Sequence, residues 1–156
     1  MTQRDESVSE QFTEYVTVII GNQLFGLPIA RVQDVFVPER LTRVPLSPPE
    51  VAGVLNLRGR IVTAIDMRCR LDLDKRADGQ PVMAIGIDLR GESYGLLVDA
   101  VGEVLKFPDS ACEAKPANLD VRWARVASGV IRLEGQLLVV LDVDRVLDMK
   151  SRAVAA

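Results

Sequence analysis

The chain has 156 residues, of which 48% are hydrophobic, and a formal net charge of −3 at pH 7. That length suits one ordinary domain or two small ones, and the apolar fraction is ample for a packed core. Histidine is missing altogether, which removes the commonest general base and the commonest zinc ligand. No run of five or more Lys and Arg residues appears, so the electrostatic signature of a nucleic-acid-binding protein is absent.

The ends of the chain predict tails rather than folded structure. Residues 1–11 are polar, lack the apolar core of a signal peptide and are expected to be disordered, and residues 150–156 are expected to form a C-terminal tail. No apolar run approaches the 18 residues of a membrane-spanning helix. Cys69 and Cys112 show no CxxC spacing, which favours free thiols in a reducing cytoplasm.

In the first half, apolar stretches alternate with turn signals. Residues 15–20 predict a buried strand, and a polar turn leads directly into a second strand. A long proline-bearing connection at 38–50 precedes an apolar hairpin at 53–66. The polar segment 72–80 then predicts a surface turn and marks the clearest boundary in the chain.

The second half has the same order of elements. Residues 81–101 predict two strands joined by a turn, and a second long connection follows at 108–127. A second apolar hairpin spans 129–142, and the chain closes on a short helix with Asp142 or Asp144 as its N-cap.

Two motifs occur twice, in the same order. Residues 53–66 (GVLNLRGRIVTAID) match residues 129–142 (GVIRLEGQLLVVLD) at an offset of 76, and residues 22–36 match residues 91–105 at an offset of 69. Duplication explains this order better than chance similarity between β-rich stretches. Gly59, placed before an apolar run in the first copy, predicts a hairpin turn that needs positive φ.

The repeat and the strand spacing together predict the fold class. Short strands with turns every eight to twelve residues indicate an all-β protein built from small barrels or sandwiches. We expect one subdomain over 12–80 and a second over 81–149. Each would be marginal alone, so the two should pack against each other.

The motifs that resemble catalytic or metal sites lack the partner residues that such sites need. The G-x-S-x-G match at 91–95 lacks a histidine partner and a following helix, and the acidic segment 72–79 has Arg76 where a calcium loop needs an acidic or amide side chain. Asp66 and Asp142 could form an acid–base pair, but their repeated place at strand ends favours helix caps or turns. We therefore expect no catalytic, metal or cofactor site, and interpret the chain as a binding module.

Four segments resemble the CheW family of bacterial chemotaxis proteins. The resemblance covers about residues 14–147, and the combination of NLRG with a downstream D-x-R and LVDAV is specific. The segments are ARVQDVF (30–36), GVLNLRGRIVTAIDMR (53–68), YGLLVDAVGEVL (94–105) and ASGVIRLEGQLLVVLDVDRVL (127–147). The resemblance implies one CheW-like domain made of two tandem, five-stranded, SH3-like β-barrels with short helices. Thr63 stands where the family often has proline, which leaves only a local strand detail in doubt.

The resemblance also implies a function. Proteins of this kind bridge the cytoplasmic tips of methyl-accepting chemoreceptors and the regulatory domain of a CheA-type histidine kinase. They have no catalytic activity and are cytoplasmic, recruited to membrane-associated receptor arrays. One alternative is an adaptor of a related chemosensory pathway that controls surface motility or gene regulation. A β-barrel nucleic-acid binder and an enzyme are remote alternatives, since the chain has one Trp, a negative charge and no histidine.

The same resemblance implies two sets of interface residues. Gly53 and Ile61 would lie near the kinase-facing end of the first barrel. Six residues would line or support the receptor-facing groove, namely Val32, Asp34, Arg58, Gly59, Met83 and Gly95.

One functional pair follows from the repeat itself. Asp34 and Arg58 have opposite charges, whereas their counterparts in the second half, Glu103 and Glu134, are both acidic. An ion pair can therefore form only in the first half, which suggests that this half has a specialised surface. The alternative is that both residues are solvated surface charges.

Overall fold

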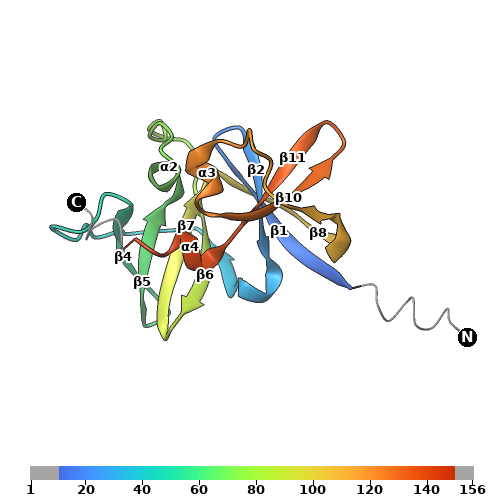
Figure 1. The fold of residues 1–156 in the computed structure, drawn as a ribbon. Coiled ribbons are helices and arrows are strands. Elements are labelled where there is room, and N and C mark those ends of the chain that lie inside the picture. The colour runs from blue at the N-terminus through green and yellow to red at the C-terminus, as the bar shows by residue number, and fades with distance from the viewer. Residues whose placement is uncertain (1–10, 150–156) are drawn as a thin grey trace, which may run out of the picture.

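The computed structural model describes residues 11–149, and over these residues the chain folds into two sheets with a few short helices (Figure 1). The six-stranded sheet has the order β8–β1–β2–β11–β10–β9. Its strands are β1 (Phe12–Ile20), β2 (Gln23–Pro28), β8 (Ala100–Pro108), β9 (Cys112–Glu113), β10 (Ala127–Leu133) and β11 (Gln136–Leu141). The tails expected at 1–10 and 150–156 lie outside the described residues.

The five-stranded sheet has the order β3–β6–β7–β5–β4. Its strands are β3 (Asp34–Phe36), β4 (Val51–Leu57), β5 (Arg60–Asp66), β6 (Met83–Leu89) and β7 (Glu92–Val98). The short helices are η1 (Ile29–Arg31), α2 (Met67–Arg70), η2 (Asp109–Ala111), α3 (Val121–Ala124) and α4 (Val143–Val146). The predicted class, two SH3-like β-barrels with short helices, is confirmed. One sheet has six strands rather than five because the two-residue β9 pairs with β10.

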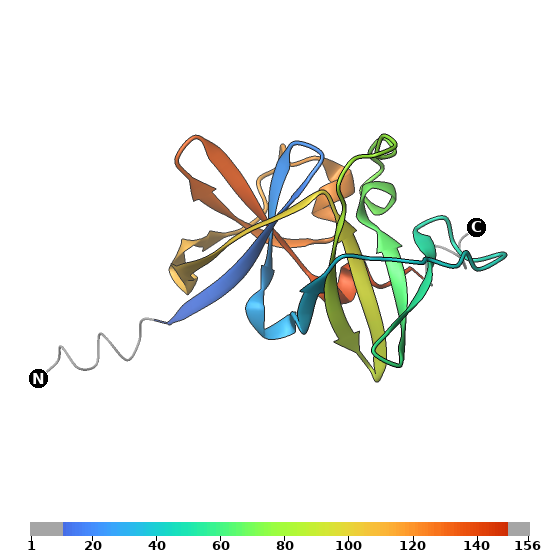
Figure 2. The ribbon, with the colours of Figure 1, turned by 180° about the vertical axis from the view of Figure 1, so that it is seen from behind.

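The internal repeat is visible in the strand pairing. β5 pairs in parallel with β7, and its counterpart β11 pairs in parallel with β2. Each sheet thus takes its strands from both halves of the chain. The chain crosses between sheets after β2 and after β7, so that β1 and β2 join the second hairpin, while β6 and β7 join the first (Figure 2). The two sheets therefore do not coincide with the expected segments 12–80 and 81–149.

The two sheets share one hydrophobic core. Buried side chains from the six-stranded sheet, such as Phe25 and Leu27, belong to the same cluster as Ile65, Ile85 and Leu96 of the five-stranded sheet. Burying an aliphatic or aromatic side chain of this size contributes about 2 kcal/mol to folding. The two sheets therefore pack against each other through this common core.

The repeated glycines Gly53 and Gly129 occupy equivalent bulges. Each lies at a register shift in its hairpin, and each lets the preceding connection approach the strand. A Cβ at Gly53 would lie 2.6 Å from the carbonyl oxygen of Thr42, and one at Gly129 would lie 2.7 Å from that of Glu113. Neither position therefore has room for a side chain.

The turn and cap predictions are also confirmed. Arg58 (φ 54°) and Gly59 (φ 84°) form the two-residue turn between β4 and β5, with both residues in the left-handed region that a type I′ turn requires. The carboxylate of Asp66 accepts the amides of α2, and that of Asp142 accepts the amide of Arg145 in α4. These two acids are helix caps rather than an acid–base pair.

Asp99 occupies the point where the chain leaves β7 of one sheet for β8 of the other. Its carboxylate accepts hydrogen bonds from Arg68 Nη2 (2.7 Å), Arg76 Nη2 (2.8 Å) and the amide of Gly21 (2.8 Å) in the β1–β2 turn. Partial burial alone would raise the pKa of Asp99, but hydrogen bonds from Arg68, Arg76 and Gly21 outweigh it and lower the pKa to about 2. The charged form of Asp99 therefore stabilises the junction between the sheets.

Asp99→Asn is expected to lower the free energy of unfolding by about 2 kcal/mol at neutral pH, since one pKa unit corresponds to about 1.4 kcal/mol. Because the pKa is lower in the folded state, this contribution is present above the unfolded pKa and is lost as the pH falls from about 4 towards 2. Urea unfolding of wild type and variant across this range should show the difference shrinking with acid. Asp144→Asn is the control, because Asp144 pairs with Arg31 at the other crossover but is 61% exposed. An equal acid-dependent loss in both variants would contradict this account of Asp99.

Candidate functional site

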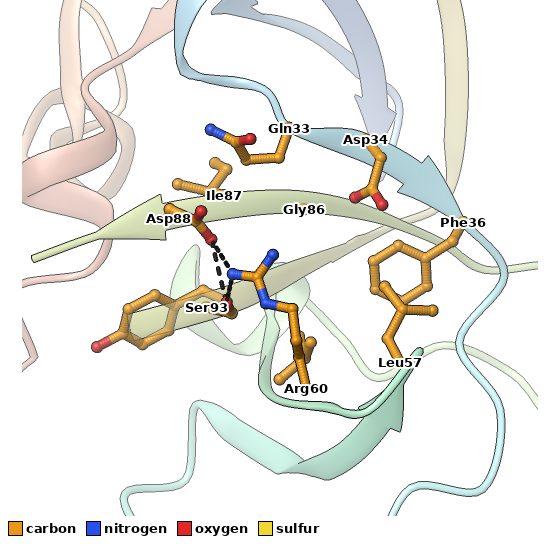
Figure 3. A pocket seen from close by; sticks show the side chains of 11 residues that line it. Gln33, Asp34, Phe36, Leu57, Arg60, Gly86, Ile87, Asp88 and Ser93 are labelled. Atoms are coloured by element: carbon orange, nitrogen blue, oxygen red, sulfur yellow. Dashed lines mark hydrogen bonds and ion pairs between the residues drawn. The ribbon is translucent and has the colours of Figure 1, made fainter. Parts of the chain in front are cut away.

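A small pocket opens at the edge strand β3 of the five-stranded sheet (Figure 3). We call it the β3 pocket. Its lining residues are Gln33, Asp34, Phe36, Leu57, Arg60, Val62, Gly86, Ile87, Asp88, Ser93 and Tyr94. Its volume is about 40 Å³, whereas small-molecule sites typically have roughly 300–1,000 Å³. The pocket is thus too small to enclose a ligand of the usual size.

A polar network crosses the β3 pocket. Arg60 of β5 donates through Nη2 to Asp88 Oδ1 (3.1 Å) and to Ser93 Oγ, and Ser93 Oγ donates to Asp88 Oδ1 (3.1 Å) (Figure 3). Arg60 remains 60% exposed. The network therefore forms a charged rim beside the apolar side chains of Phe36 and Val62.

The predicted ion pair is present at the same rim. Arg58 Nη1 lies 3.5 Å from Asp34 Oδ2. Asp34 begins β3 and Arg58 lies in the turn that ends β4, and these two strands are the opposite edges of the five-stranded sheet. The pair thus joins the two edges. Because Arg58 is 78% exposed, it should contribute only about 0–1 kcal/mol to folding.

The other residues expected in the receptor-facing groove lie at different depths. Gly59 is exposed in the turn beside Arg58, and its amide donates to Asn56 Oδ1 (2.9 Å). Val32 and Met83 are half-buried and pack against the shared core. Gly95 is buried in β7.

The two residues expected at the kinase-facing end also differ in exposure. Ile61 is 63% exposed on β5 and lines a shallow groove together with Arg40 and Thr42. Gly53 is buried, and the backbone of Thr42 lies over it. Gly53 therefore shapes this end of the sheet without offering a side chain to a partner.

Sequence reasoning missed the apolar side chains on the connection between β3 and β4. This connection projects beyond the sheet (Figure 2). Its exposed hydrophobic residues are Val37, Leu41, Val44 and Leu46, of which Leu46 is fully exposed. The sequence could have indicated them, because Val and Leu recur in a proline-bearing connection, and polar residues such as Asn, Asp and Ser are more usual in connections.

Two SH3-like barrels with a common core, an ion-paired rim and an exposed apolar connection define a double-barrel module for binding proteins. The chain belongs to the CheW family, because the family model described as the CheW-like domain matches residues 14–151.

Individual relatives support this assignment. The chain is 26% identical over 155 residues to "Chemotaxis protein CheW" of Rhizobium meliloti, covering 99% of this chain and 100% of the relative. It is also 26% identical to the Bacillus subtilis protein of the same name, covering 87% of each chain. The crystal structure of the scaffolding protein TtCheW from Thermoanaerobacter tengcongensis matches with a TM-score of 0.74 at 26% identity, covering 84% of this chain and 89% of that one.

Proposed function

We propose that this chain is a non-catalytic scaffold of bacterial chemotaxis that couples chemoreceptors to a CheA-type histidine kinase. The observation that carries the proposal is the CheW-like match over residues 14–151, together with curated relatives named as chemotaxis proteins and a solved relative named as a scaffolding protein.

The proposed receptor-facing surface is centred on the ion pair of Asp34 and Arg58. Both side chains reach solvent at the rim of the β3 pocket, next to the exposed turn residue Gly59. In this proposal Val32 and Met83, which pack against the shared core, and Gly95, whose Cβ would lie 3.3 Å from Phe36 Cζ, support the surface without forming it.

The proposed kinase-facing surface is centred on Ile61. An exposed isoleucine beside an apolar connection can serve as an anchor if the partner desolvates it fully, because the residues that carry most of the binding energy lie in well-packed, fully desolvated pockets. The partner is the regulatory domain of the kinase. We expect an interface of roughly 800 Å² on each side and an affinity in the micromolar range, typical of a transient adaptor.

The proposed location is the cytoplasm, at receptor arrays associated with the membrane. In the part of the chain that the structure describes, no helix is long and apolar enough to cross a membrane. Recruitment would then occur through the receptors rather than through insertion into lipid.

Ile61→Asp is expected to weaken binding of the kinase regulatory domain at least about tenfold, which corresponds to 1.4 kcal/mol. The substitution replaces a desolvated apolar contact by a charge without touching the core. Isothermal titration calorimetry measures the affinity. Val121→Asp is the matched control, because Val121 is 67% exposed on α3 in the other part of the molecule. Equal affinity for wild type and Ile61→Asp would exclude this face as the kinase surface.

A further inference from the structure

A row of small residues crosses the five-stranded sheet beside β3. In the strand register, Asp34 faces Gly86 of β6, Gly86 faces Gly95 of β7, and Gly95 faces Ala64 of β5. Residues that face one another in register project from the same side of a sheet. Among these four residues, Asp34 is therefore the one with a side chain larger than a methyl group.

The two glycines leave room for side chains of β3. A Cβ at Gly86 would overlap Asp34 Oδ1, and a Cβ at Gly95 would lie 3.3 Å from Phe36 Cζ. The carboxylate of Asp34 thus occupies the space that a side chain at position 86 would fill. Figure 3 shows Asp34 projecting from β3 toward the strand that carries Gly86.

We propose that Gly86 is a positioning residue that seats the carboxylate of Asp34 where it meets Arg58. Gly86 does not touch the partner. It acts through Asp34, so its effect on coupling rests on the proposed function of the Asp34–Arg58 pair.

The geometry separates this role from a role in stability. Gly86 does not have the positive φ that alanine would find strained, because its backbone lies outside the left-handed range. The atom that a methyl group would displace is the far end of a side chain, and the Asp34 side chain is 33% exposed. The displaced carboxylate can therefore turn into water at little cost to folding. The ion pair, in contrast, depends on where that carboxylate lies.

The first test measures receptor-dependent kinase activation with wild type, Gly86→Ala, Asp34→Ala and the double variant. Gly86→Ala is expected to lower activation by the same factor as Asp34→Ala, and the double variant is expected to be no worse than either single one. Two defects that multiply would show that Gly86 acts independently of Asp34 and would overturn the proposal. Gly26→Ala is the matched control, because Gly26 is a strand glycine of the other sheet, and the three atoms nearest to its Cβ would belong to the side chain of Leu138.

The second test does not depend on the proposed function. A crystal structure of Gly86→Ala should show the Asp34 carboxylate beyond about 4 Å, the limit of an ion pair, from Arg58 Nη1. A carboxylate that remains paired with Arg58 would overturn the positioning role. If the pair is broken but Asp34→Ala leaves activation unchanged, the positioning role stands, and it is the function assigned to the Asp34–Arg58 pair that fails.

Discussion

Gly53→Ala should lower the free energy of unfolding by about 3 kcal/mol, the largest loss expected for a single methyl group in this protein. Gly53 has φ 153°, and a Cβ would lie 2.6 Å from the carbonyl oxygen of Thr42. A strained backbone conformation costs about 1–3 kcal/mol, and overpacking costs a similar amount. The methyl group would also disturb the two backbone hydrogen bonds, each 2.8 Å long, that join Thr42 to Val54. Urea unfolding measures the loss.

The repeat provides a second site and a control for this prediction. Gly129→Ala should cost about 2 kcal/mol, because its Cβ would lie 2.7 Å from the carbonyl oxygen of Glu113. Gly59→Ala is the control, since Gly59 has φ 84° but no atom within 4 Å of a Cβ. It should cost only about 1 kcal/mol. A loss for Gly53→Ala no larger than that for Gly59→Ala would contradict the importance of the close backbone approach.

Arg58→Glu should leave the fold nearly intact and strongly impair receptor-dependent control of the kinase. The substitution places a second acid beside Asp34, so the two edges of the five-stranded sheet repel each other instead of pairing. Since an exposed ion pair contributes about 0–1 kcal/mol to folding, unfolding should change little. The charge reversal therefore acts mainly on the rim that the proposed receptor surface uses. The kinase assay with receptor-containing membranes measures the defect, and urea unfolding verifies the fold.

Exchanging the two charges tests whether Asp34 and Arg58 act as a pair. The double variant Asp34→Arg with Arg58→Asp restores opposite charges in swapped places and should recover part of the lost control. A double-mutant cycle isolates the pairwise contribution. Single defects that simply add, with no recovery in the exchanged variant, would mean that the two residues act separately.

The sequence was sufficient to predict the local elements of this fold. Periodic Val, Leu and Ile residues between turn signals predicted the hairpins, and the recurring glycines predicted the turn at Gly59. Asp66 and Asp142 were correctly interpreted as caps from their repeated position. The sequence pattern did not predict which strands pair with each other in the sheets. Either copy of a repeat can pair with either hairpin, and the exchange between halves depends on the crossovers after β2 and β7.

The interaction surface was only partly predictable. Asp34 and Arg58 could be identified because they carry opposite charges, whereas their counterparts in the other half of the repeat are both acidic. The sequence did not indicate a role for Gly86, because its contribution is the absence of a side chain, which leaves space for the carboxylate of Asp34. The exposure of Leu46 was also hidden, because a leucine in a sequence usually indicates burial.

The most direct test of the central claim is a co-sedimentation experiment with membranes that contain a chemoreceptor. Purified CheA-type kinase is added with and without this chain, and the kinase in the pellet and its autophosphorylation rate are measured. The account predicts that the kinase sediments with the receptors, and that its rate responds to receptor ligand, when the chain is present and not when it is omitted. A kinase that sediments and responds equally well without the chain would contradict the proposed coupling role.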